Sequence, residues 1–122
     1  MKTFGTTVTF VKRSDGALIG YSAIGHSGYA EAGADIVCAA ISALTQTTLN
    51  GLANVLKAPV MFDQDDDGAF IEAKLTPEAS EEQIQQAQLL LVTLLEGLQA
   101  IQRGYPRNVR IIFKERRSST CS

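Results

Sequence analysis

The chain opens with two short segments in which the hydrophobic pattern has a period of two residues. Residues 6–12 place valine and phenylalanine between threonines, and residues 18–24 form a second, more apolar run. Alternation of this kind is typical of strands with one buried face. The pair Asp15-Gly16 between the two runs is a frequent hairpin turn. The pattern therefore predicts an opening β-hairpin.

After a glycine-rich stretch the period changes to that of a helix. Apolar and small side chains recur three and four residues apart, which predicts a long helix from about residue 35 to about residue 56. Gly51 weakens this pattern but does not end it. The positions that carry the periodicity are Ile36, Ala40, Ile41, Leu44, Thr48, Leu52 and Val55.

Three further strands are predicted in the second half of the chain. Residues 59–62 and 69–75 are two strand candidates, joined by an acidic turn that ends in Asp67-Gly68. Residues 109–113 alternate again and predict a last strand near the C-terminus.

Between these strands a second helix is expected. Ser80 and Gln83 have the spacing of a capping box, which marks a helix start, and Gly104 and Pro106 mark its end. The helix has more apolar positions than one buried stripe needs, so it is either sandwiched within the domain or partly buried against another subunit. The extra apolar residues are Leu89, Leu90, Val92 and Leu94.

The predicted order of elements is β-β-α-β-β-α-β. This order favours an α+β domain in two layers, with a mixed or antiparallel sheet and two helices packed on it. The length of 122 residues and the 45% apolar content suit one compact domain. We expect that domain to span residues 1–117 and residues 118–122 to form a polar tail.

Charge and targeting signals add little to this description. The net charge of −2 gives no argument for a nucleic-acid or membrane-surface protein. Residues 63–82 carry eight acids and residues 103–117 six basic residues, which is read most simply as two solvated faces. The alternative is that an anionic or ribosomal partner binds the arginines of the second segment, which are Arg107, Arg110, Arg116 and Arg117.

The N-terminus lacks the apolar segment of a signal peptide, and no apolar run approaches the roughly 20 residues of a membrane span. Cytoplasmic residence is therefore expected, where thiols stay reduced. Cys38 and Cys121 are accordingly not expected to form a disulfide.

One glycine-rich segment holds the only histidine of the chain, His26, and one of its two cysteines, Cys38. If Asp35 is the N-cap of the first helix, Cys38 is the third helical residue and the positive end of the helix dipole favours its thiolate form. An imidazolium delivered by the loop would stabilise that thiolate and protonate a leaving amine. The simpler alternative is a small core cysteine and a solvated histidine.

Other kinds of site fit the sequence poorly. The glycine spacing matches neither a phosphate-binding loop nor a dinucleotide fingerprint. Zinc would need acids such as Glu31 or Asp35 beside one histidine and one cysteine, without any CxxC or HExxH spacing. The acidic turn begins like a calcium loop, but Lys74 stands where a bidentate glutamate is required. No metal and no cofactor are therefore expected.

Residues 25–42, GHSGYAEAGADIVCAAIS, resemble the signature of the ribosomal-processing cysteine protease family known as Prp. The elements that coincide are Gly-His, Gly-Tyr-Ala-Glu, a further glycine, Asp-Ile-Val-Cys-Ala-Ala and a serine four residues after the cysteine. Length, element order and the acidic second hairpin are similar to the family across essentially the whole chain. Ser27 departs from the alanine of many relatives.

The resemblance implies a homodimeric endopeptidase that removes a short N-terminal extension from a large-subunit ribosomal protein precursor, without need of nucleic acid or a membrane. By position, His26 is the dyad histidine, Cys38 is the nucleophile, and Asp35 and Ser42 are supporting residues. The loop that family members keep mobile corresponds to Gly25, Ser27, Gly28 and Gly33.

The residue pattern and the family resemblance favour the same mechanism, in which Cys38 attacks the substrate and His26 protonates the leaving amine. Backbone N–H groups at the helix start, including that of Cys38, are the expected oxyanion donors. Ser42 falls one turn beyond Cys38 on the same helix face. Two rival functions remain: a non-catalytic ribosome-associated binding factor, and a thiol redox protein in which the tail brings Cys121 to Cys38.

Overall fold

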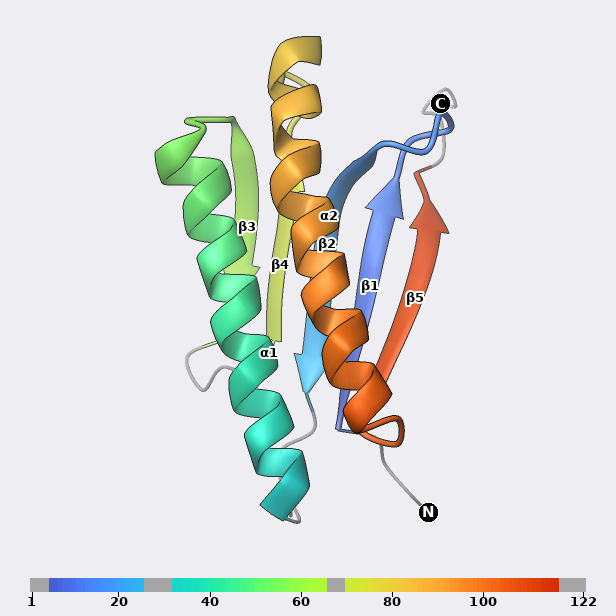
Figure 1. The fold of residues 1–122 in the computed structure, drawn as a ribbon. Coiled ribbons are helices and arrows are strands. Elements are labelled where there is room, and N and C mark those ends of the chain that lie inside the picture. Colours follow the sequence, from blue (N-terminus) through green and yellow to red (C-terminus); the bar gives the residue numbers. More distant parts are fainter. Residues whose placement is uncertain (1–4, 26–31, 66–69, 117–122) are drawn as a thin grey trace.

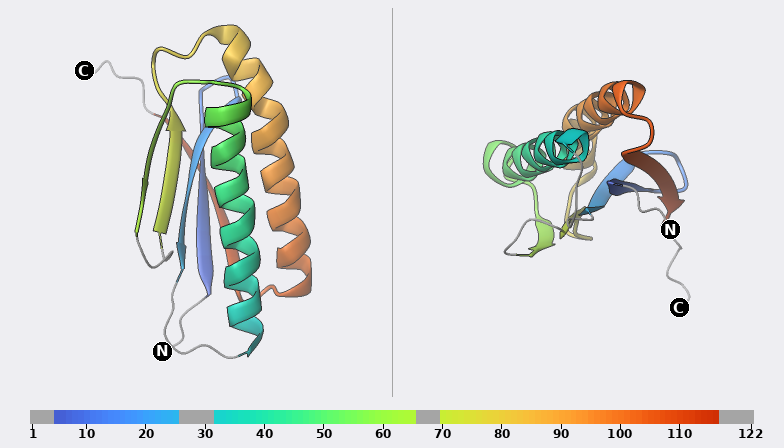
Figure 2. Two further views of the ribbon diagram at one scale, coloured as in Figure 1. Left: turned by 90° about the vertical axis from the view of Figure 1, so that its left-hand side faces the viewer. Right: turned by 90° about the horizontal axis from the view of Figure 1, so that it is seen from below.

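The computed structural model describes residues 5–25, 32–65 and 70–116, and of residues 32–35 it describes the backbone alone. A five-stranded sheet forms one layer, and two helices lie side by side on one of its faces (Figures 1 and 2). The predicted α+β class and element order are confirmed. The elements are β1 (Thr6–Lys12), β2 (Leu18–Gly25), α1 (Ala32–Asn50), the π-helical turn η1 (Gly51–Val55), β3 (Val60–Gln64), β4 (Phe70–Leu75), α2 (Glu81–Gly104) and β5 (Val109–Glu115).

The strand order β3-β4-β2-β1-β5 makes the sheet mixed. The pairs β1–β2, β2–β4 and β3–β4 are antiparallel, whereas β5 pairs with β1 in parallel. Parallel strands need a long crossover connection, usually a helix. Helix α2 supplies it, because it carries the chain from β4 across the helical face to the far edge of the sheet (Figure 1).

The core lies between the sheet and the two helices. Val8 and Phe10 of β1 pair with Ala23 and Tyr21 of β2, and all four side chains are buried. Their alternation along the strands is the pattern that the sequence predicted. The helices complete the core with residues that include Val37, Ile41, Leu52, Leu91 and Leu98.

Tyr21 is the one buried phenol among the described residues, and it joins the two layers. Its ring is fully buried, and its hydroxyl donates a hydrogen bond of 2.7 Å to the carbonyl of Thr45 in α1. Burial raises the pKa of Tyr21 well above the usual range of a phenol. The side chain therefore stays a neutral donor that ties β2 to α1.

Helix α2 begins and ends where its sequence signals indicated. The Ser80 side chain accepts a hydrogen bond from the Gln83 N–H, and the Gln83 side chain accepts one from the Ser80 N–H, which completes the predicted capping box. At the other end the Tyr105 N–H donates to the carbonyl of Ile101.

The extra apolar residues of α2 have different environments. Leu94 is buried, and Leu90 lies against η1, where a Cβ on Gly51 would come within 2.8 Å of its methyl group. Leu89 and Val92 are 74% and 44% exposed. Helix α2 is therefore partly sandwiched within the domain and partly uncovered.

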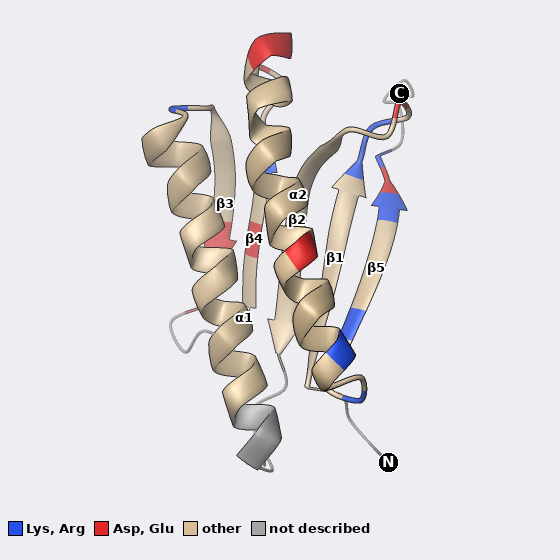
Figure 3. Ribbon diagram, viewed as in Figure 1, with Lys and Arg blue, Asp and Glu red and all other residues tan. Residues whose placement is uncertain are grey.

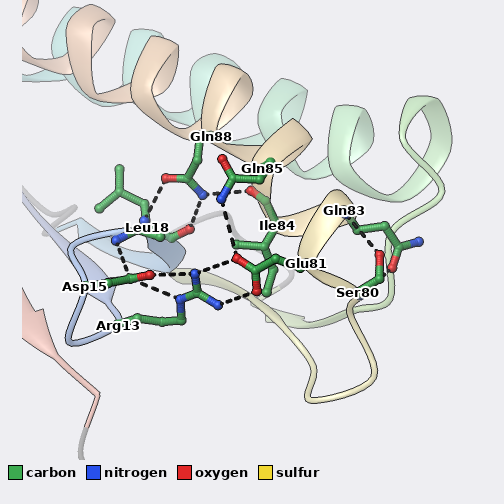
Figure 4. A network of polar contacts seen from close by, with 10 residues as sticks. Arg13, Asp15, Leu18, Ser80, Glu81, Gln83, Ile84, Gln85 and Gln88 are labelled. Atoms are coloured by element: carbon green, nitrogen blue, oxygen red, sulfur yellow. Dashed lines mark hydrogen bonds and ion pairs between the residues drawn. The ribbon is translucent and has the colours of Figure 1, made fainter.

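A polar network fastens the β1–β2 turn to the first turns of α2 (Figure 4). The Arg13 guanidinium donates to the carboxylates of Asp15 and Glu81 at 2.8–3.1 Å. Beside it the Gln88 amide accepts from the Leu18 N–H and donates to the Leu18 carbonyl, both at 2.8 Å. These bonds satisfy backbone groups next to the irregularity at which the β1–β2 register shifts.

The Arg13 network makes stability depend on pH. The backbone N–H of Ala17 and the Arg13 guanidinium lower the pKa of Asp15, and Arg13 lowers the pKa of Glu81. A carboxyl with a lowered folded pKa contributes stability that is complete above its unfolded pKa, about 4, and is lost as the pH falls through the folded value.

We therefore expect Arg13→Met to reduce stability slightly at pH 7, because the carboxylates are exposed and screened by water. The difference from the unsubstituted protein should vanish in acid. Urea unfolding at neutral and strongly acidic pH measures this. An equal loss at both pH values would contradict the ion-pair explanation and point to lost packing of the arginine stem.

Charged residues lie on both edges of the sheet and along α2 (Figure 3). Asp63 on β3 and Glu72 on β4 are near one edge, and Arg110 and Lys114 lie on β5 at the other. This matches the two oppositely charged segments of the sequence. The separation of charge is only partial, because Lys74 lies on β4 and Glu115 on β5.

Although the sequence has no uninterrupted apolar run of membrane length, the helical stretch Ile36–Val55 is long and apolar enough to cross a membrane by length and composition alone. Its inner face packs on the sheet through Val37, Ile41 and Leu52. A core helix meets the same criterion, so the stretch is weak evidence for a membrane protein.

Candidate active site

Cys38 lies at the end of the molecule where β1 begins, β2 ends and α1 begins (Figure 1). Its side chain is half-buried, and its sulfur is 3.4 Å from the hydroxyl oxygen of Thr6. The backbone of Gly25 is the other neighbour: a Cβ built there would lie 3.8 Å from Cys38 Sγ and 3.5 Å from Thr6 Oγ1. Three elements thus meet around one thiol.

Strand register holds this arrangement in place. Thr6 and Gly25 are paired residues of β1 and β2, and the Thr6 N–H donates to the carbonyl of Asn108 just before β5. Gly5 allows that approach, because a Cβ there would lie 2.7 Å from the Asn108 oxygen. The Thr6 backbone is therefore fixed from both neighbouring strands.

The predicted site residues are only partly within the described structure. Cys38 and Ser42 both lie in α1, four residues apart and half-buried, so they share one helix face. The carbonyl of Ser42 accepts a hydrogen bond of 3.2 Å from the Thr45 hydroxyl. His26, Ser27, Gly28 and the side chain of Asp35 lie outside the described residues.

The predicted start of the first helix is wrong. Helix α1 begins at Ala32 rather than at Asp35, so Asp35 is not the N-cap and Cys38 is the seventh helical residue rather than the third. The N–H of a residue this far along is directed to the carbonyl four residues before it, here Ala34. It is not one of the free N–H groups of the first turn, so it does not serve as an oxyanion donor.

The helix-dipole argument changes for the same reason. The effect of the dipole is concentrated in the first turn, and Cys38 lies in the second. The connection between β2 and α1 is also shorter than the predicted loop, because Gly25 is the last residue of β2 and Gly33 is the second residue of α1. Gly33 costs the helix about 1 kcal/mol relative to alanine, which the packing of Val37 and Ile41 in the core can offset.

Thr6 is the site residue that sequence reasoning missed. It is only 3% exposed, although threonine is usually a surface residue, and its hydroxyl contacts the sulfur of a residue 32 positions away. In the sequence it is one of several threonines that alternate along the first strand. Only the tertiary packing of β1 against α1 distinguishes it from Thr7 and Thr9.

The chemistry available at this place is that of a thiol. A half-buried sulfur beside a hydroxyl suits a nucleophile, since the thiolate is the reactive form and is stabilised by hydrogen-bond donors. Across the described part of the chain no group of three or more His, Cys, Asp and Glu side chains gathers in a way that would hold a metal ion.

Comparison with models of known protein families finds a match over most of the chain. The model of the family described as cysteine protease Prp matches residues 6–110. This range runs from the strand that carries Thr6 to the one that begins after Asn108.

Curated relatives carry the same description. The ribosomal processing cysteine protease Prp of Bacillus subtilis is 28% identical over 102 residues, which cover 83% of this chain and 91% of that protein. The protein of the same name from Staphylococcus aureus is 30% identical over 108 residues, covering 88% of this chain and 98% of that protein.

Solved structures agree with these sequence matches. The crystal structure of the essential ribosomal processing protease Prp from S. aureus with a substrate peptide gives a TM-score of 0.77 at 28% identity, over 89% of this chain and 99% of that one. The same enzyme with a covalently linked product peptide gives 0.74 at 29% identity, over the same shares. The protein SMU.848 from Streptococcus mutans gives 0.79 at 28% identity, over 93% and 97%.

Proposed function

The chain belongs to the cysteine protease Prp family, and from that premise we propose that it removes the N-terminal extension of a large-subunit ribosomal protein precursor with a Cys38–His26 dyad. The observation that carries the residue assignment is the position of Gly25 beside the Cys38 sulfur. His26 is bonded directly to Gly25, and consecutive Cα atoms lie about 3.8 Å apart. The sequence therefore continues to its only histidine directly after the residue that lies beside the Cys38 sulfur.

The first half of the proposed reaction transfers the acyl group. The Cys38 thiolate attacks the scissile carbonyl carbon and forms a C–S bond, while His26 is an imidazolium. As the C–N bond breaks, His26 gives its proton to the leaving amine nitrogen. The products are a thioester on Cys38, a neutral His26 and the released downstream chain.

Hydrolysis completes the cycle. Neutral His26 takes a proton from water, whose oxygen attacks the thioester carbonyl. The C–S bond breaks, and the extension leaves as a carboxylic acid while the thiolate and imidazolium return. A covalently linked product peptide is known for the S. aureus enzyme, which supports an acyl-enzyme route in this chain.

The helix start at Ala32 changes the role proposed for Asp35 and leaves that of Ser42 as predicted. Since Asp35 is inside α1, capping no longer accounts for it, and we propose that its carboxylate orients His26. Ser42 shares the helix face of Cys38 one turn on, where its hydroxyl can steady the site. Hydrogen-bond donors other than the Cys38 N–H must therefore bind the oxyanion.

The substrate proposal rests on family membership. The S. aureus relative binds a substrate peptide and is named for ribosomal processing, so the substrate proposed for this chain is an extension peptide of a ribosomal protein. Ribosome maturation also gives the reason to propose cytoplasmic residence. Neither nucleic acid nor a cofactor enters the proposed reaction.

We also propose a homodimer. Leu89 and Val92 of α2 and Val55 of the contacting turn η1 are large apolar side chains left exposed on the helical side. Exposed apolar groups on neighbouring elements are typical of a surface that a second subunit covers. Light scattering should give twice the 13.1 kDa mass of the chain, and a monomer at working concentration would contradict the proposal.

The function is tested with a synthetic peptide that spans the junction between the extension and the mature ribosomal protein of the same organism. Mass spectrometry should find one cut at the mature start. Binding of the peptide without any cut would favour the non-catalytic ribosome-associated factor instead. Cleavage of unrelated unstructured peptides at similar rates would contradict the proposed substrate.

A further inference from the structure

We infer that Thr6 is a positioning residue for the Cys38 nucleophile, its hydroxyl donating a hydrogen bond to the thiolate. The inference rests on the proposed role of Cys38, and it concerns how this chain prepares the sulfur before substrate binds. The contact of 3.4 Å between Thr6 Oγ1 and Cys38 Sγ is the observation behind it.

The Thr6 hydroxyl is placed where water is scarce. Thr6 is 3% exposed, and its side chain is on the helix side of β1, in the same row as the buried Val8 and Phe10. A buried hydroxyl without a partner costs free energy, so such groups are almost always hydrogen-bonded. Within the described residues, this hydroxyl is in hydrogen-bonding contact with the Cys38 sulfur.

The direction of the hydrogen bond follows from the ionisation of the sulfur. With a neutral thiol either atom can donate. A thiolate has no proton, so the hydroxyl must then donate, and a hydrogen bond to a charged acceptor is about twice as strong as a neutral one. The Thr6 hydroxyl therefore stabilises the reactive form of Cys38 more than the unreactive form.

The backbone holds the donor rigidly. The Thr6 N–H is bonded to the Asn108 carbonyl at 3.0 Å, and Thr6 is paired with Gly25 across the β1–β2 ladder. A β-branched side chain also has few rotamers. The hydroxyl is thus in place without any rearrangement, which compensates for the second-turn position of Cys38, where the helix dipole contributes little.

Thiol alkylation tests the inference without using protease activity. In a Cys121→Ser background, so that Cys38 is the only thiol, the rate of reaction with iodoacetamide is measured from pH 5 to pH 10. The variants are Thr6→Val, which keeps the shape and loses the hydroxyl, and Thr6→Ser, which keeps the hydroxyl. Thr9→Val, on the other face of the same strand, is the matched control.

Thr6→Val should slow the alkylation of Cys38 at neutral pH about tenfold, because valine cannot donate a hydrogen bond to the sulfur. Thr6→Ser and Thr9→Val should react at the rate of the parent. In peptide cleavage the valine variant should lower kcat and leave KM nearly unchanged.

An unchanged alkylation rate in Thr6→Val, or a larger loss of rate in Thr6→Ser than in Thr6→Val, would overturn the inference, because the second result is what a packing role of the methyl group predicts. If the valine variant does not fold, Thr6→Ala takes its place against Thr6→Ser with the same expected order. Alkylation does not depend on cleavage. A protein that cleaves no junction peptide but shows the expected alkylation rates would contradict the protease proposal and still support the role of Thr6.

Discussion

Replacing Cys38 with alanine lowers the rate of precursor cleavage by roughly 10⁴-fold or more, because the proposed acyl-enzyme forms on the Cys38 sulfur. His26→Ala costs a similar amount, since a nucleophile and its acid–base partner act as a unit. Cleavage of the junction peptide is followed by mass spectrometry at an enzyme concentration high enough to detect slow turnover.

The control for this experiment is Cys121→Ser, which removes the other cysteine and should keep full activity. Cys38→Ala should lower the thermal transition only slightly, because it leaves the Thr6 hydroxyl without its sulfur partner but places a residue that favours helices in α1. Substantial cleavage by a folded Cys38→Ala protein would refute the assignment of the nucleophile. Loss of activity in Cys121→Ser would revive the redox alternative.

Replacing Gly20 with alanine destabilises the fold by about 1–3 kcal/mol, as overpacking does in a well-packed interior. Gly20 lies in β2, paired with Lys74 of β4. A Cβ at this position would lie 2.7 Å from the carbonyl oxygen of Ala73 and 3.0 Å from the Cα of Lys74. Both are backbone atoms of the neighbouring strand, so relief requires the sheet to move.

Urea unfolding measures this difference, and Gly104→Ala is the matched control. Gly104 ends α2, and a Cβ there would meet no atom within 4 Å, so that variant should be as stable as the parent. A Gly20→Ala protein with undiminished stability would show that β2 and β4 are not packed as described. Gly25 lies five residues further along β2, so the variant should lose activity only to the extent that it unfolds.

Much of the fold could be predicted because local signals and tertiary structure agree. The turn at Asp15-Gly16 has Gly16 at a φ of 94°, a conformation that glycine adopts readily, and the Ser80–Gln83 capping box forms as its spacing indicated. The parallel pairing of β5 with β1 was not predictable, since it depends on which strand the long crossover reaches.

The start of α1 shows where local reasoning failed. The sequence pattern groups Gly33 with the loop glycines, yet a single glycine costs a helix about 1 kcal/mol, which the packed inner face of α1 can offset. A helix that starts after Asp35 would have Asp35 as its N-cap and Cys38 in its first turn. The nucleophile could still be recognised by its residue type and its segment, whereas its electrostatic surroundings could not.

Thr6 marks the limit of the sequence for the site itself. Its contact with Cys38 joins the first strand to the first helix across 32 positions. No spacing rule connects residues so far apart, because the contact depends on strand register and on how α1 lies on the sheet. Predicting it from the sequence would require the packed structure.

The most direct measurement uses a peptide of the extension that ends in a chloromethyl ketone at the scissile position. The account predicts that the protein is inactivated with one equivalent of peptide, and that peptide mapping finds a single thioether on Cys38. Inactivation with the label on any other residue, or full activity of protein labelled on Cys38, would contradict the claim that this thiol is the nucleophile.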